Sequence, residues 1–368
     1  MHYLQKTAMA LLLLILSGCA GQETFSARVL WPTPPARPYM ELKNVFYSED
    51  QFPKTGMQVF LEGLTGKGEL ATFSRPFGVA GDNQGIVYIS DPWEKNIRVY
   101  DFNRRSVEYY SKDNMGTPYG LAVDQKGQLY VVDPAIPGVR IYSANRQPLR
   151  VIGSAEELTR PIYIALNERL GRLYLSDSEA GKVVVYSLAG EYLFTFAKQG
   201  GAEGELGGPR GIAIDKQDRV FVADGINTHI SVFDAEGAFL YRFGVRGDQH
   251  SQFEQPRGLA FDSDGNLYIA DARKGALLTY KPDGTFLLYT GAGKPTNEAF
   301  GFSMPTSLWI DASDQIFVTD TLLKRFSLWQ YVSDAYLAAH PITPADQSEI
   351  EALLKKAQEE GKQATPSR

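Results

Sequence analysis

The chain has 368 residues, 12% of them aromatic and 22% charged, which is an ordinary globular balance with enough apolar side chains for a large core. The formal net charge is −6 and no Lys/Arg-rich run occurs, so the sequence lacks the electrostatics and the motifs of a nucleic-acid-binding protein. A single cysteine excludes an intrachain disulfide, and the absence of a Cys-x-x-Cys-His motif excludes covalently attached haem.

Residues 1–18 have the features of a secretory signal peptide. Lys6 supplies positive charge, and the apolar run Ala8 to Leu16 is far shorter than the ~20 residues that a membrane-spanning helix needs. The run ends at Leu16-Ser17-Gly18-Cys19, which resembles the lipobox of bacterial lipoproteins. The resemblance implies that Cys19 becomes the lipidated N-terminus and anchors the protein in a membrane. Ala20 favours the outer membrane, with the face unspecified. The alternative is an ordinary signal peptide that happens to contain a cysteine.

The rest of the chain divides into three parts. Residues 19–38 begin with the lipidated cysteine and continue as an extended spacer, because four prolines stiffen this stretch. Residues 39–334 form the globular domain. Residues 335–368 form a tail, in which Thr343 as N-cap and Gly361 as stop signal predict a short C-terminal helix.

The globular domain contains six copies of one pattern. Each copy has a proline, two apolar strands joined by a polar turn, and an aspartate 15 residues after the proline, or 16 in the third copy. The repeat prolines are Pro76, Pro118, Pro161, Pro209, Pro256 and Pro305, and the repeat aspartates are Asp91, Asp133, Asp177, Asp224, Asp271 and Asp320. The prolines lie 42 to 49 residues apart, which indicates a fixed hairpin joined by loops of changing length. A period near 45 residues with four strands predicts an all-β fold, a six-bladed β-propeller with four-stranded blades.

An N-terminal strand is expected to close the last blade. The sixth copy has three strands and loses the pattern after Trp329. Met57 to Glu62 reads as an unpaired strand at the distance from Pro76 expected of a fourth strand, so we expect it to complete the ring. Tyr39 to Phe46 is expected to add one more strand. An open ring would leave two sheet edges unpaired.

Single copies resemble the NHL repeat. Pro209 to Asp215, followed by Val220 to Asp224, carries this resemblance, which extends over about residues 57–332. The third and sixth copies depart from it, with Tyr163 and Ser307 where the repeat has glycine. The layout as a whole resembles bacterial NHL-repeat lipoproteins. Relatives of this layout often occur beside exported multihaem cytochromes, which suggests an accessory role in an envelope electron-transfer complex.

The candidate binding site follows from the same resemblance, which implies that the residue after each repeat proline lies at the mouth of the central channel. These residues are Phe77, Tyr119, Ile162, Arg210, Arg257 and Thr306. A rim that is aromatic and apolar on one side and cationic on the other suits an anionic or aromatic group of a protein, peptide or glycan partner. The alternative is that both arginines pair with neighbouring acids and the aromatic rings simply pack.

Metal sites have weaker signals. We expect the repeat aspartates to accept backbone N–H groups in the following turn and not to form a carboxylate ring for a metal. The segment Asp262 to Asn266 resembles the start of a calcium loop, but no acid stands at the twelfth position, so a tight turn is expected. No cofactor is expected, although a Ca²⁺ ion in the channel remains an alternative.

Catalysis has little support in the sequence. After the signal peptide the histidines are His229, His250 and His340, and the first two are not spaced as a metal pair. No Ser/His/Asp arrangement follows from their positions. We therefore expect a non-catalytic binding or scaffold propeller. Six-bladed relatives include calcium-dependent lactonases and a zinc-dependent lyase, so the alternative is a divalent-cation-dependent envelope hydrolase or lyase. A purely structural lipoprotein is the remaining alternative.

Overall fold

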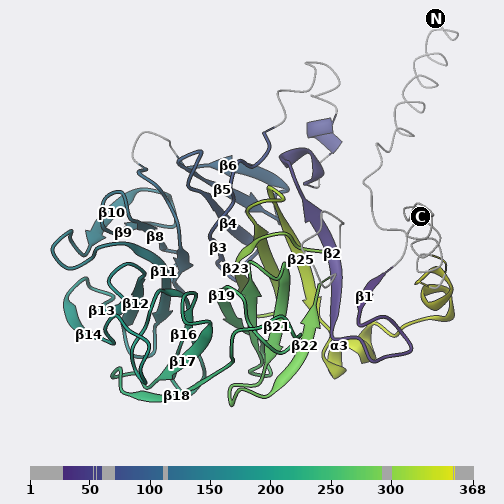
Figure 1. Cartoon of the computed structure of the whole chain (residues 1–368). Helices are drawn as coiled ribbons and strands as arrows, with labels where there is room; N and C mark the ends of the chain where they lie inside the picture. The colour runs from purple at the N-terminus through teal and green to yellow at the C-terminus, as the bar shows by residue number, and fades with distance from the viewer. Residues whose placement is uncertain are drawn as a thin grey trace, which may run out of the picture.

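Six antiparallel sheets make up the domain, and they confirm the predicted all-β, six-bladed propeller (Figure 1). The computed structural model describes residues 28–52, 54, 56–59, 71–110, 115–291, 301–350 and 352. Cys19 and the predicted signal peptide lie outside these residues. Within them, no helix is both long and apolar enough to cross a membrane.

The blades follow one another along the chain. Blade 1 is β3 (Val79–Gly81), β4 (Ile86–Asp91), β5 (Asn96–Asp101) and β6 (Ser106–Tyr109). Blade 2 is β7 (Leu121–Val123), β8 (Leu129–Asp133), β9 (Gly138–Tyr142) and β10 (Pro148–Ile152). Blade 3 is β11 (Pro161–Asn167), β12 (Arg172–Asp177), β13 (Lys182–Ser187) and β14 (Tyr192–Phe196). Blade 4 is β15 (Pro209–Ile214), β16 (Val220–Asp224), β17 (His229–Phe233) and β18 (Phe239–Phe243). Blade 5 is β19 (Pro256–Phe261), β20 (Leu267–Asp271), β21 (Ala276–Tyr280) and β22 (Phe286–Thr290). Blade 6 is β23 (Pro305–Ile310), β24 (Gln315–Asp320), β25 (Arg325–Tyr331) and β2 (Met40–Phe46), with β1 (Val29–Trp31) at its edge.

The core lies between neighbouring blades. Each first strand contacts the first strand of the next blade, from β3 through β7, β11, β15, β19 and β23 and back to β3. β16 and β17, the second and third strands of blade 4, are buried at every position, because a neighbouring blade covers each face of the sheet. β18, the fourth strand of blade 4, alternates between half-buried and exposed residues because it forms the outer edge of its sheet.

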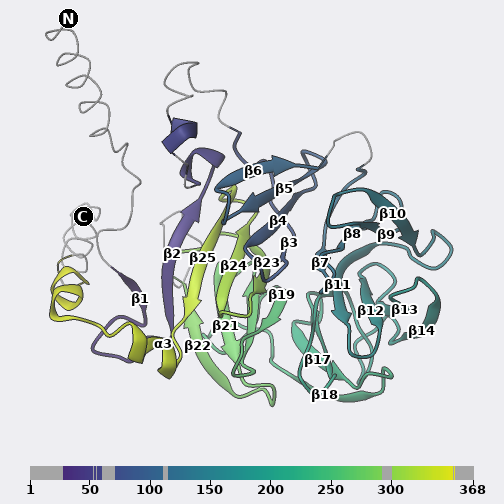
Figure 2. The ribbon, with the colours of Figure 1, turned by 180° about the vertical axis from the view of Figure 1, so that it is seen from behind.

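The ring is closed by a different strand from the one that the sequence predicted. β2 pairs with β25 through six residue pairs and lies beside it in both views (Figures 1 and 2). Phe46 stacks on Phe326 with ring centroids 4.6 Å apart. The prediction for Met57 to Glu62 was wrong: residues 56–59 are helical, and Met57 is 67% exposed. The described part of that segment therefore adds no strand to blade 6, which buries both faces of β2 instead.

Part of the expected spacer is docked on the propeller. β1 pairs with β2, and the Trp31 indole N–H donates to the Tyr289 carbonyl oxygen at 2.7 Å. Arg28 bonds the Glu41 carboxylate and the carbonyl oxygen of His340, which ties this end of the chain to the C-terminal segment.

The C-terminal segment contains two helical stretches. The short helix α3 (Asp334–Ala339) was not predicted, and in both views it lies near β1 (Figures 1 and 2). Residues 344–350 are helical, and the Thr343 hydroxyl accepts the N–H of Asp346 at 3.2 Å. This confirms Thr343 as the cap. The predicted stop at Gly361 lies outside the described residues.

Candidate functional site

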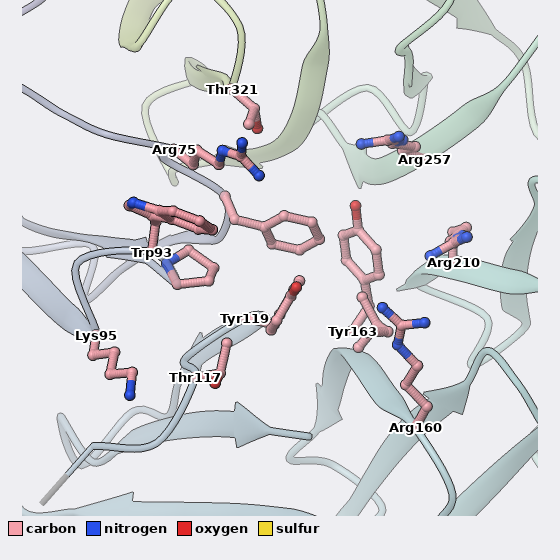
Figure 3. A pocket seen from close by; sticks show the side chains of 13 residues that line it. Arg75, Trp93, Lys95, Thr117, Tyr119, Arg160, Tyr163, Arg210, Arg257 and Thr321 are labelled. Carbon is pink, nitrogen blue, oxygen red and sulfur yellow. The ribbon is translucent and has the colours of Figure 1, made fainter. Parts of the chain in front are cut away.

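A cavity of about 670 Å³ opens at one end of the central channel, and we call it the mouth cavity (Figure 3). It is lined by Arg75, Phe77, Pro92, Trp93, Lys95, Thr117, Tyr119, Arg160, Ile162, Tyr163, Arg210, Arg257 and Thr321. Five of the six residues that follow a repeat proline are among them. A cavity of this size suits a small ligand or one segment of a larger partner.

The repeat aspartates hold the backbone around this mouth. In every blade the carboxylate accepts the N–H groups of the two residues before the proline. The same carboxylate also accepts N–H groups of the turn after its own strand, such as those of Ile226 and Asn227 on Asp224. The expected turn role is confirmed. Each aspartate additionally fixes the segment that leads into the mouth, which the sequence did not predict.

Glycines let the first strands meet backbone to backbone. A Cβ on Gly211 would overlap the carbonyl oxygen of Arg257 in the next blade. Gly120 also lies close to blade 3, where its N–H donates to the Ile162 carbonyl oxygen at 2.9 Å. This close approach brings the residues after the repeat prolines into one cavity.

Tyr163 occupies the third glycine position and forms the floor of the cavity. Its side chain reaches across the channel, and the phenol donates to the Thr306 carbonyl oxygen at 2.8 Å. Burial raises the pKa of Tyr163 to about 12, so the phenol stays protonated and remains a donor. Thr306, expected at the rim, is instead fully buried and does not line the cavity. Its hydroxyl lies 2.6 Å from that of Thr321, which does line it.

One side of the mouth cavity is aromatic. Phe77 packs edge-on against Tyr119 with ring centroids 4.7 Å apart, and its ring lies 5.2 Å from that of Tyr163. Trp93 is 67% exposed, and the guanidinium of Arg75 lies 4.5 Å from its ring centroid. A cation over an indole face is a favourable pair that leaves the guanidinium N–H groups open to a ligand.

The other side is cationic. Arg160, Arg210 and Arg257 face Arg75, Trp93 and Lys95 across the cavity, with Tyr119 and Tyr163 between them (Figure 3). We call the three arginines the cationic wall. Burial lowers the pKa of the Arg210 guanidinium, and the charges of Arg257 and Arg160 lower it further.

The cationic wall has no acidic partner among the residues that the structure describes. No carboxylate lines the mouth cavity, and none of the ion pairs in the described ranges includes Arg75 or a wall arginine. Arg257 donates to the neutral amide oxygen of Gln255 at 3.2 Å. Within the described ranges, Arg210 and Arg257 do not pair with acids, so this half of the alternative is wrong. The aromatic rings do pack against one another, as the alternative expected.

Several lining residues were missed by the sequence analysis. Arg75 and Arg160 stand directly before a repeat proline, and Trp93 and Lys95 follow a repeat aspartate. The repeat itself could have identified these residues, because each stands at a set distance from a repeat proline or a repeat aspartate, as the residues after the prolines do. They were overlooked because the repeat aspartates were expected to organise only their own turn.

The candidate metal and catalytic residues do not line the mouth cavity. The described ranges hold no group of three or more His, Cys, Asp or Glu side chains able to bind a metal. Asp262 accepts the backbone N–H of Asn266 at 2.8 Å, which confirms the predicted tight turn. His229 is buried in β17, where burial lowers its pKa, and its Nε2 has no hydrogen-bond partner. His250 stacks on Tyr289.

Comparison with known proteins agrees with the fold. A family model described as a 6-bladed beta-propeller matches residues 202–291, which include β15 to β22. No curated protein matches the chain.

Solved structures with this fold are also similar. One is a protein of unknown function from Bacteroides thetaiotaomicron, with a TM-score of 0.60 and 21% identity over 72% of this chain and 71% of that one. A gluconolactonase from Xanthomonas campestris has a TM-score of 0.55 and 18% identity over 70% and 86%. A streptogramin B lyase has a TM-score of 0.54 and 10% identity over 70% and 94%. At these identities the likeness is one of fold.

Proposed function

We propose that this protein is a non-catalytic binding propeller that recruits a partner in the cell envelope by holding an anionic group in the mouth cavity. The observation that carries the proposal is the cationic wall without a carboxylate partner. Three guanidinium groups that face one cavity repel one another, and a bound carboxylate, phosphate or sulfate relieves that repulsion. Guanidinium groups also bind such anions in a bidentate manner, which gives specificity as well as affinity.

The enzymatic alternative has less support. Propellers similar in fold include a gluconolactonase, a virginiamycin B lyase and a streptogramin B lyase, and the sequence left a divalent-cation-dependent hydrolase or lyase open. A divalent cation needs several oxygen ligands, yet four arginines and a lysine line this mouth cavity. Their charge repels a metal ion and attracts an anion. The binding proposal therefore fits the lining better.

The proposed cellular setting comes from the sequence. Lipidation of Cys19 would hold the protein at the outer membrane, and the NHL-type repeats would present the mouth cavity to a protein, peptide or glycan partner. An accessory role beside an exported electron-transfer complex is consistent with this arrangement. The net charge of −6 of the whole chain makes the local positive charge of the mouth a distinct feature of the surface.

The test is a pull-down from gently solubilised membranes with the wild type, an Arg210→Gln/Arg257→Gln variant and an Arg104→Gln/Arg105→Gln control. Both variants remove two positive charges, but Arg104 and Arg105 are exposed in the hairpin between β5 and β6 and do not line the cavity. We expect the control to recover the same partner as the wild type and the cavity variant to lose it.

Two outcomes of the pull-down would contradict the proposal. Equal recovery of the partner by both variants would remove the mouth cavity from the interaction. Recovery of no partner, together with a stoichiometric divalent metal in the purified protein and hydrolase or lyase activity that a chelator abolishes, would replace the proposal with the enzymatic alternative.

A further inference from the structure

Large apolar side chains stand exposed in the turns around the mouth cavity. Trp93, Ile136, Ile226 and Leu322 are 67%, 49%, 56% and 62% exposed. Each lies two or three residues after a repeat aspartate, in the turn between the second and third strands of its blade. We call these four residues the apolar ring. Exposed apolar groups that gather around a cavity are typical of interaction surfaces.

The backbone that carries the ring is fixed. The N–H of Trp93 donates to Asp91 at 3.2 Å, and the N–H of Ile226 donates to Asp224 at 3.0 Å. Both aspartates also hold the chain that leads into the mouth cavity. Side chains on such turns are preorganised, so a ligand loses little affinity in ordering them.

The ring is continuous with the mouth cavity. Trp93 lines the cavity itself, and Leu322 directly follows Thr321, which also lines it. The carbonyl oxygen of Ile226 accepts the Arg246 guanidinium at 2.8 Å, which links this turn to the loop between blades 4 and 5. The mouth cavity with its cationic wall and the apolar ring therefore belong to one face of the propeller.

The charges farther out on this face distinguish between possible occupants. Glu156, Glu203 and Asp248 are exposed in the loops that lead from one blade to the next repeat proline, and two of these loops also carry an exposed cation, Lys198 or Arg246. A flat anionic surface such as a phospholipid bilayer would bring its charge against these acids. A narrow ligand that enters the mouth cavity meets four arginines, one lysine and no carboxylate among its lining residues.

We propose that the apolar ring and the mouth cavity together bind an acidic peptide segment whose apolar side chains flank the acidic ones. The acidic groups enter the mouth cavity, and the apolar side chains pack on the ring. This inference rests on the proposed function and goes beyond it by naming the class of partner.

The test measures binding of two N-terminally fluorescein-labelled peptides, (Glu-Leu)4 and (Glu-Ser)4, by fluorescence anisotropy. They carry equal charge and differ in apolar content. Four forms of the full-length protein are compared: the wild type, Ile226→Ser/Leu322→Ser, Arg210→Gln/Arg257→Gln, and a control, Leu149→Ser/Leu193→Ser. The control removes apolar side chains that are 46% and 40% exposed on β10 and β14, away from the mouth.

We expect the wild type and the control to bind (Glu-Leu)4 about 10-fold more tightly than (Glu-Ser)4, because two leucine-sized contacts are buried on binding. The ring variant, which keeps Trp93 and Ile136, should show a smaller preference for (Glu-Leu)4 than the wild type and an unchanged affinity for (Glu-Ser)4. The arginine variant should lose both.

The inference and the proposed function fail separately. Equal affinity of the wild type for the two peptides, or a preference as large in the ring variant as in the wild type, would overturn the inference and leave arginine-dependent anion binding intact. Unchanged binding by the arginine variant would overturn the proposed function. The wild type could instead bind neither peptide but sediment with phosphatidylglycerol vesicles, while the ring variant does not sediment. That result would replace the peptide with a membrane surface as the ligand.

Discussion

The role of the repeat aspartates can be tested in blade 4. Asp224 is fully buried, and its carboxylate accepts the backbone N–H groups of Gly207, Gly208, Ile226 and Asn227 at 2.6, 3.1, 3.0 and 2.9 Å. The Asn227 amide adds a fifth hydrogen bond at 2.9 Å. Replacing Asp224 with alanine leaves the four backbone N–H donors at this largely buried carboxylate position without an acceptor, each costing about 1 kcal/mol. We expect the free energy of unfolding to fall by about 4 kcal/mol.

Urea unfolding, followed by tryptophan fluorescence and far-UV circular dichroism, measures this loss. The matched control is Asp234→Ala in the same blade, because Asp234 accepts two N–H groups, from Glu236 and Ala238, in a solvent-exposed turn. Water replaces those bonds, so the control should lose about 1 kcal/mol or less. If Asp224→Ala is too unstable to purify, Asp224→Asn, which keeps one acceptor oxygen, should lose about half as much. Equal losses for Asp224→Ala and Asp234→Ala would refute the reasoning.

Three further predictions concern the channel and blade 4. Gly211→Ala should lower the melting temperature by several degrees, because its Cβ would overlap the Arg257 carbonyl oxygen; an unchanged melting temperature would contradict the close approach. Tyr163→Phe should lower the free energy of unfolding by about 1 kcal/mol in urea titrations, since it removes the hydrogen bond to Thr306, and an equal or higher stability would contradict that bond. Burial lowers the pKa of His229 in the folded state. The unfolded state therefore binds a proton near pH 6.5 that the folded state does not bind, and the free energy of unfolding should fall as the pH drops below that value. His229→Gln should flatten this dependence between about pH 7 and pH 5 in urea titrations, and a slope equal to that of the wild type would assign the dependence to other groups.

The sequence by itself determined the architecture. The repeat proline and aspartate lie at a nearly constant spacing, and hairpins form from neighbouring residues, so six hairpins could be counted without any tertiary information. The resemblance to the NHL repeat implied that Phe77, Tyr119, Arg210 and Arg257 lie at one end of the channel, and the structure brings them together in the mouth cavity.

The strand that closes the ring was decided by tertiary packing. Met40 to Phe46 and Met57 to Glu62 are both short apolar segments ahead of the first blade, and either suits a strand by local pattern. The choice depends on which segment fits blade 6, almost 300 residues away, where Phe46 stacks on Phe326. Local sequence carries no information about such a pairing.

The character of the site was decided in the same way. Arg160, Arg210 and Arg257 form a cationic wall because the folded chain brings no described carboxylate to them, and no sequence window can show that. Tyr163 was noted as a departure from the repeat, but its role as the cavity floor depends on the Thr306 carbonyl oxygen in blade 6. The strands of each blade could be predicted from the repeat, because hairpins form between residues that are close in the sequence. The character of the mouth cavity could not be predicted in this way, because contacts between residues of different blades exist only once the ring has closed.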